Sequence, residues 1–273
     1  MQPLSRRDFV RCAAGVGALA LAGCAAGRPT PPAPTPTATP SLPTTQPDLR
    51  HGTLDTRLGA TEKPTWRLAL PTTRPATGTI LALHALGGSV SDWFDGLKVG
   101  PYADELGLAI AAVDGGKSWW HPRKDGSDTG RMVLEDLLPV IEKEGAPTER
   151  LGLTGISMGG FGALHLALQI PAARLMGVST ISAALATDAA YVDEVAFDGK
   201  EDFDRHSPLH HTERYLPLAI WMACGRQDPF FAANKKFADA LPRALTTFDQ
   251  GGHGTEYWFA HIDGAMRFFD GKA

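Results

Sequence analysis

Gly155-Ile156-Ser157-Met158-Gly159-Gly160 is the stretch of the chain that indicates its fold most directly. It joins an apolar run at 150–156 to an Ala- and Leu-rich stretch at 158–169. A serine between glycines at a strand-to-helix turn takes a strained backbone conformation, in which its hydroxyl stands clear of the sheet. The pattern therefore predicts that Ser157 is a nucleophile at the end of a strand, with its hydroxyl clear of the sheet.

Apolar runs and helical patterns alternate on both sides of this turn, which predicts an α/β fold whose central sheet is mostly parallel. Several predicted strands are unbroken apolar runs, as expected when helices cover both faces of the sheet. The predicted strands are 66–70, 79–84, 108–113, 150–156, 177–182, 218–224 and 245–248. The predicted helices are 101–106, 129–144, 158–169, 232–241 and 255–269.

A serine nucleophile needs a base that takes its proton and a carboxylate that orients the base. In hydrolases with this turn, the acid and then the histidine follow the serine along the chain. Asp228 and His253 each follow a predicted strand, at the sheet edge where open α/β folds place their sites. We therefore predict a triad of Ser157, Asp228 and His253, with three carboxylates as rivals for the acid: Asp198, Asp202 and Asp204.

Two backbone amides are candidates for an oxyanion hole. The Met158 amide follows the nucleophile, and the Leu86 amide lies in a glycine-containing loop after an earlier strand. His84, in the same loop, is interpreted as a structural hydrogen-bonding residue rather than a catalytic one. Trp119 and Trp120 are candidates for a substrate pocket, and a purely packing role is the open alternative.

The N-terminus has the pattern of a bacterial export signal. Paired arginines, Arg6 and Arg7, precede a modest apolar segment that is too short to span a bilayer. Leu21-Ala22-Gly23-Cys24 resembles the lipobox of bacterial lipoproteins. We expect residues 1–23 to be a twin-arginine lipoprotein signal and Cys24 to carry the lipid; the alternative is a signal cleaved elsewhere.

The remaining chain divides into a tether and a folded domain. Residues 28–47 contain eight prolines and six threonines, too little apolar surface to fold, so 24–50 is expected to be a disordered stalk. The catalytic domain is expected to span 51–273. Its long polar stretch 186–211 is either a lid or a surface excursion.

The composition is that of an ordinary soluble domain. The chain has 26 Lys and Arg and 30 Asp and Glu, so its formal net charge is −4. This charge gives no general electrostatic attraction for the phosphates of nucleic acid. Three cysteines cannot form a disulfide framework, and no Cys or His spacing is that of a zinc site. We expect neither a metal nor an organic cofactor.

The motifs together resemble the esterase D and S-formylglutathione hydrolase group of α/β-hydrolases, with mycolyltransferases of the antigen 85 type as relatives. The resemblance covers about residues 60–270 and rests on five segments: 83–88, 114–120, 155–164, 224–228 and 253–258. It implies the α/β-hydrolase fold and the same triad, with Leu86 and Met158 as oxyanion donors.

The resulting expectation is an exported serine carboxylesterase that works through an acyl-enzyme. Its substrate would be a small-molecule, lipid or cell-wall ester, and Cys24 would anchor it to the outer face of the bacterial cytoplasmic membrane. Without the lipid it would be secreted. Two alternatives remain open: a mycolyltransferase-like enzyme that moves an acyl group to a sugar hydroxyl, and a non-catalytic binding lipoprotein. The sequence leaves the oligomeric state undetermined.

Overall fold

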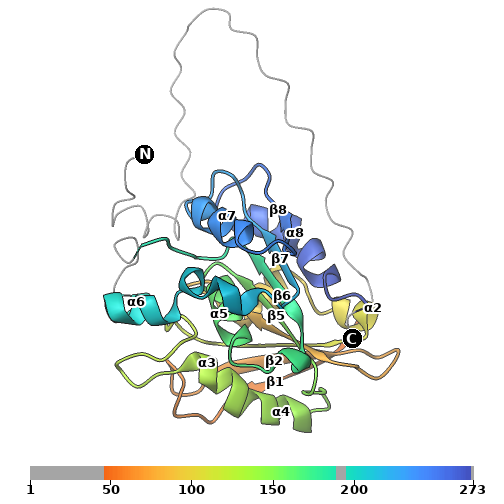
Figure 1. Cartoon of the computed structure of the whole chain (residues 1–273). Helices are drawn as coiled ribbons and strands as arrows, with labels where there is room; N and C mark the ends of the chain where they lie inside the picture. The colour runs from red at the N-terminus through yellow and green to blue at the C-terminus, as the bar shows by residue number, and fades with distance from the viewer. Residues whose placement is uncertain (1–45, 189–194, 272–273) are drawn as a thin grey trace, which may run out of the picture.

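The central element of the computed structural model, which describes residues 46–188 and 195–271, is an eight-stranded sheet with the order β1-β2-β4-β3-β5-β6-β7-β8 (Figure 1). β2 is antiparallel to both β1 and β4, and every other neighbouring pair is parallel. The strands are β1 (Asp48–Thr53), β2 (Thr65–Leu70), β3 (Thr79–Leu83), β4 (Ala109–Val113), β5 (Leu151–Ile156), β6 (Leu175–Ile181), β7 (Ile220–Ala223) and β8 (Leu245–Thr247).

Helices cover the sheet on both faces (Figure 1). The α-helices are α2 (Tyr102–Leu106), α3 (Thr129–Met132), α4 (Leu138–Lys143), α5 (Met158–Ala167), α6 (Lys200–His206), α7 (Phe231–Asp239) and α8 (Thr255–Arg267). Two π-helical turns are η1 (Asp92–Gly96) and η2 (Val133–Leu137), and η2 joins α3 to α4. The short 3-10 turns are η3 (Ala172–Arg174), η5 (Pro208–His210) and η6 (Thr212–Tyr215).

Alternation along the strands divides the core into two layers. In β3, Leu81 and Leu83 pack into the layer under α3 to α5 and α7, whereas Ile80 and Ala82 pack into the layer under α2 and α8. All five residues of β3 are buried, as are those of β4. A mostly parallel sheet with helices on both faces confirms the predicted α/β-hydrolase fold.

β1 was not expected from the sequence. Its six residues, Asp48–Thr53, are mostly polar and half exposed, so they carry no apolar pattern, and they are held by pairing with β2 from Asp48 against Leu70 to Thr53 against Thr65. The sheet therefore begins at Asp48, within the stretch that the sequence interpretation gave to the tether.

The described part of the candidate lid packs against the domain. Residues 195–211 include α6, and Ala196, Phe197 and Phe203 are buried in the core. Arg123 pairs with Asp198 at 2.9 Å and fixes the start of this segment. Residues 189–194, the expected signal peptide, Cys24 and the tether as far as residue 45 lie outside the described residues. Among the described helices, none has the length and apolar character needed to cross a bilayer.

Candidate active site

Ser157 stands at a sharp turn between β5 and α5. Its backbone has φ 54° and ψ −116°, a conformation that costs energy for any residue with a side chain. The neighbouring chain holds it there, because the Ser157 amide donates to Ile181 O at 3.0 Å and its carbonyl accepts from Phe161 N at 3.1 Å and Ala184 N at 2.9 Å. The strained turn predicted from the sequence is therefore present.

Glycines around the turn allow the close approach of α5 to the sheet. A Cβ atom on Gly159 would collide with the Leu83 carbonyl at the end of β3, and one on Gly160 would lie 2.8 Å from Ala183 Cα. Both contacts are with backbone, which has no rotamer to move aside. The start of α5 is consequently pressed against the loop that follows β3.

His253 connects Ser157 to a carboxylate. It lies in the loop between β8 and α8, with Nε2 2.9 Å from Ser157 Oγ and Nδ1 2.8 Å from Asp228 Oδ2. An ionised carboxylate can only accept, so the Nδ1–H donates to it and the Nε2 lone pair faces the hydroxyl. This is the orientation in which an imidazole can take the serine proton.

Asp228 follows β7 in a tight turn. Its side chain is fully buried, and its amide donates to Gly225 O at 3.0 Å. The second carboxylate oxygen, Oδ1, accepts from Phe230 N at 2.8 Å. A buried carboxylate is stable only when it is paired and hydrogen-bonded. The Phe230 amide holds Oδ1, and Oδ2 accepts from His253.

Two aromatic rings flank the imidazole of His253. The ring centroid of Phe230 lies 5.2 Å away and that of Trp258 lies 5.4 Å away, both edge-on, and the His253 side chain is only 7% exposed. The rings restrict the imidazole and limit water around it. Neither was singled out from the sequence, although Phe230 follows Asp228 by two positions and Trp258 lies in the segment that carries the resemblance.

The Leu86 and Met158 amides are free to bind an oxyanion. Within the part of the chain that the structure describes, neither amide has a hydrogen-bond partner. Met158 opens α5, where the first amides of a helix point outward and add a partial positive charge. Leu86 belongs to the loop after β3, against which α5 is packed by Gly159.

His84 has a structural role beneath this loop. Its Nδ1 lies 2.7 Å from Ala85 O and its Nε2 accepts from Gly115 N at 2.8 Å, so the proton resides on Nδ1. The side chain is buried, and this burial lowers the pKa of His84. A neutral imidazole with both nitrogens occupied matches the structural interpretation made from the sequence.

Trp119 and Trp120 are both buried, at 1% and 0% exposure. Trp120 packs against His84 and against Gly162 of α5, and Trp119 packs edge-on against Phe161. Their described contacts are those of the packing alternative rather than of a surface pocket. Both have positive φ angles, 62° and 58°, which the tight loop after β4 imposes.

The rival aspartates are paired elsewhere. Asp198 pairs with Arg123 at 2.9 Å, Asp202 with His206 at 2.9 Å, and Asp204 with Lys200. The geometry can therefore move a proton from the hydroxyl of Ser157 to His253, with Asp228 as the only one of the four carboxylates in contact with the imidazole.

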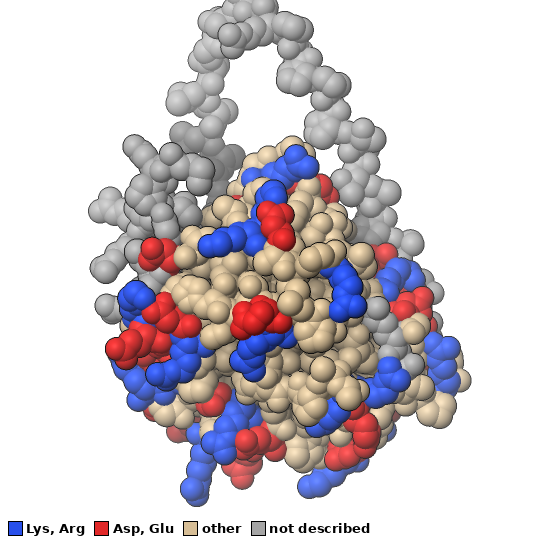
Figure 2. Space-filling model, viewed as in Figure 1, with Lys and Arg blue, Asp and Glu red and all other residues tan. Residues whose placement is uncertain are grey.

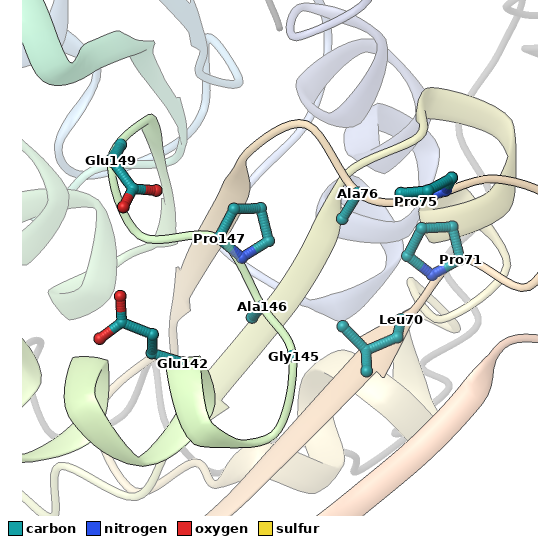
Figure 3. A pocket seen from close by; sticks show the side chains of 9 residues that line it. All are labelled: Leu70, Pro71, Pro75, Ala76, Glu142, Gly145, Ala146, Pro147 and Glu149. Atoms are coloured by element: carbon teal, nitrogen blue, oxygen red, sulfur yellow. The ribbon is translucent and has the colours of Figure 1, made fainter.

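The surface hollow of about 410 Å³ between β2 and the loop before β5 lies apart from this site (Figure 3). Its lining includes Leu70, Pro147 and Glu149, at the end of the sheet where β5 begins, whereas Ser157 follows the opposite end of β5. On the face drawn in Figure 2, basic and acidic side chains are interspersed, as the near-neutral composition implies.

Comparisons with known proteins are consistent with this geometry. The model of a family described as "Putative esterase" matches residues 61–269. An acetyl esterase from Caldicellulosiruptor saccharolyticus is 22% identical over 224 residues, which cover 70% of this chain and 82% of that protein.

Solved structures with the same fold include two from Staphylococcus aureus. The fluorophosphonate-binding serine hydrolase F (FphF), with substrate bound, has a TM-score of 0.70 at 18% identity, over 82% of this chain and 99% of that chain. The S-formylglutathione hydrolase FrmB has a TM-score of 0.67 at 19% identity, over the same shares. At these identities the likeness shows the fold, and it agrees with the resemblance seen in the sequence.

Proposed function

The chain belongs to this esterase family and is a serine ester hydrolase, and we propose that Ser157, His253 and Asp228 carry out its reaction. The observation that supports this assignment is the continuous pair of hydrogen bonds from Asp228 through His253 to Ser157, at 2.8 and 2.9 Å. The substrate class is a carboxylic ester.

In the proposed first half-reaction, His253 Nε2 takes the proton of Ser157 as Oγ attacks the ester carbonyl carbon. The carbonyl oxygen becomes an oxyanion that accepts hydrogen bonds from the Leu86 and Met158 amides. Each such donor typically contributes about 10²–10³ in rate. The imidazolium then protonates the alcohol oxygen as its bond to the carbonyl carbon breaks, so the alcohol departs and the acyl group stays on Ser157.

In the second half-reaction, His253 removes a proton from water, whose oxygen attacks the acyl carbon. The bond from that carbon to Ser157 Oγ then breaks, the carboxylic acid leaves, and the imidazolium returns its proton to Oγ. Asp228 stabilises the imidazolium in both halves and keeps its own charge. The bond to Asp228 fixes the imidazole tautomer, and the flanking rings of Phe230 and Trp258 restrict the orientation of the ring for both transfers.

We propose that the acyl group is short. The support for this is the matched acetyl esterase, which is named for the smallest common acyl group. Export and a lipid anchor at Cys24 complete the proposal; they rest on the sequence pattern of residues 5–24 alone.

A panel of p-nitrophenyl esters from acetate to palmitate tests the function. We expect the wild-type chain to give its highest kcat/KM on acetate or butyrate, and Ser157→Ala to lose turnover on every ester. Absence of turnover by the wild-type chain on the whole panel would contradict the proposal. Labelled acyl donor incubated with sugar should yield free acid; a labelled sugar ester would identify an acyltransferase instead.

A further inference from the structure

Three polar side chains from distant parts of the chain meet beside α5, away from Ser157. They are His121, in the loop after β4, and Asp202 and His206, one turn apart on α6. One ligand-type atom from each lies within 4.8 Å of the other two. In Figure 1, α6 lies at the margin of the molecule near α5.

His121 is the member of the cluster that has a buried nitrogen without a hydrogen bond in the described structure. Its side chain is completely buried, and its Nε2 lies 2.8 Å from Ala196 O, so the proton resides on that nitrogen. The Nδ1 lone pair points into the cluster, 3.9 Å from Asp202 Oδ2, with no hydrogen-bond partner in the described structure. A buried acceptor without a partner costs free energy, and a metal ion would remove that cost.

Hydrogen bonds hold the side chains of Asp202 and His206 in place. Asp202 Oδ2 accepts from Asp198 N at 2.9 Å, and Oδ1 lies 2.9 Å from His206 Nδ1. Nδ1 of His206 also lies 3.0 Å from the Asp202 backbone carbonyl, which can only accept, so the proton is on Nδ1 and Nε2 carries the lone pair. The bonds from the Asp198 amide and to the Asp202 backbone carbonyl are of the outer kind that orients metal ligands in known sites, where their loss costs about 10–100-fold in affinity.

His165 of α5 lies beside the cluster and has a buried imidazole nitrogen without a hydrogen bond in the described structure. This nitrogen is Nε2, and the ring centroid of His165 lies 5.2 Å from that of His206 and 6.1 Å from that of His121.

We propose that His121, Asp202 and His206 bind a divalent transition metal, with Zn²⁺ as the ion that the donor set fits best. Two neutral imidazoles and one carboxylate form a nitrogen and oxygen set typical of Zn²⁺, and His165 or water would complete a tetrahedron. Ligand atoms around tetrahedral Zn²⁺ are about 3.4 Å apart, so the side chains need only small rotations. The metal would fasten α6 to the body of the domain.

Ligand spacing in the sequence does not indicate this site, because the proposed ligands come from two segments about 80 residues apart. The separation of 4 positions between Asp202 and His206 puts them on one helix face, but a single such pair is common on any helix. The expectation of no metal, drawn from ligand spacing, could not anticipate a third ligand contributed by the loop after β4.

Metal content and stability of the purified full-length chain test the site. The protein is stripped with EDTA, given Zn²⁺ and desalted. We expect one Zn²⁺ per chain and, at Zn²⁺ about 100-fold above Kd, a Tm rise of roughly 5–10 °C. Co²⁺ in place of Zn²⁺ should give the visible absorption of a tetrahedral site. Failure of the wild-type chain to retain Zn²⁺ would overturn the proposal.

Matched variants locate the ion. Asp202→Asn and His206→Gln should lower Zn²⁺ affinity at least 100-fold and abolish the rise in Tm. His210→Gln is the control, since His210 lies in the same segment but faces Asp204 at 3.6 Å. Equal Zn²⁺ binding by all three variants would place the ion elsewhere and overturn the assignment. If a variant fails to fold, the wild-type Co²⁺ spectrum still decides, because a spectrum without tetrahedral bands counts against the site.

Discussion

One imidazole ring makes both of the hydrogen bonds on which the proposed chemistry depends. His253 is 2.9 Å from Ser157 Oγ and 2.8 Å from Asp228 Oδ2. The two nitrogens therefore have different tasks, since one receives a proton during the reaction and the other keeps its proton throughout. A change at Asp228 acts on Ser157 only through the orientation and tautomer of this ring.

Replacing Asp228 by Asn should reduce kcat by about 10⁴ with little change in folding, because the amide favours the wrong imidazole tautomer. Steady-state hydrolysis of p-nitrophenyl acetate measures the loss. Asp204→Asn is the matched control, since that carboxylate pairs with Lys200 on α6 and should leave kcat unchanged. A loss of less than tenfold in Asp228→Asn would show that another carboxylate serves His253.

Ser157, Asp228 and His253 could be chosen from the sequence because each lies at the end of a predicted strand and the chain order restricts the choice. Phe230 and Trp258 could not be chosen in this way. Their contact with the imidazole depends on how the loops after β7 and β8 fold over each other, for which a single sequence gives no signal.

Helix α5 lies close to the loop after β4 because Gly162, on the side of the helix that faces Trp120, has no side chain. A Cβ on Gly162 would lie 2.5 Å from Trp120 Cδ1 and 2.7 Å from its Cβ, and Trp120 is fully buried. The helix, the loop after β4 and the nucleophile turn are therefore packed as one unit.

Gly162→Ala should destabilise the protein by about 1–3 kcal/mol, the usual cost of overpacking a filled core. Urea denaturation followed by tryptophan fluorescence measures this free energy of unfolding. Gly96→Ala provides the comparison, since the nearest atom to its Cβ would be 3.9 Å away. Equal stability of Gly162→Ala and wild type would show that α5 can move away from Trp120.

The segment that carries α6 is attached partly by the ion pair between Arg123 and Asp198. The Arg123 guanidinium lowers the pKa of Asp198 from the usual 3.8 to about 2. A depressed pKa means that the folded state favours the charged carboxylate. The resulting stabilisation is complete above about pH 5 and is lost as the pH falls through 3.8 toward 2.

Asp198→Asn should therefore lower the free energy of unfolding by about 1–2 kcal/mol at pH 7, and by less at pH 3. Urea titrations of the wild type and the variant at pH 7 and at pH 3 measure whether the loss of unfolding free energy is smaller at the lower pH. Asp239→Asn, which removes an exposed pair with Lys235, should cost well under 1 kcal/mol at either pH. A cost for Asp198→Asn that is the same at pH 7 and pH 3 would rule out the ion pair as its cause.

Strands with unbroken apolar runs, such as β3 and β5, were predicted within one or two residues. β1 and α6 were not, for opposite physical reasons. β1 is polar and is held by its ladder with β2, whereas α6 buries a single apolar side chain, Phe203, and depends on charged contacts. Neither element has an apolar period that a sequence could reveal.

At the scale of the whole molecule, the proposed export signal, lipid anchor and tether would hold the esterase domain outside the cell membrane. The anchor has a direct test in cells that express the full chain. Cys24→Ser should move the protein from the membrane fraction to the soluble fraction, because the sulfur is the only attachment point proposed. An unchanged distribution would refute lipidation at Cys24, whereas the esterase activity should be equal in both forms.

Covalent labelling reports on the nucleophile itself, which we assign to Ser157. A fluorophosphonate reacts with an activated serine hydroxyl, so peptide mass spectrometry of the labelled wild-type chain should find one adduct, on the peptide that contains Ser157. Ser157→Ala should take up no label, and prior incubation with p-nitrophenyl acetate should slow labelling of the wild type. An adduct on another residue, or labelling that persists in Ser157→Ala, would contradict the assignment.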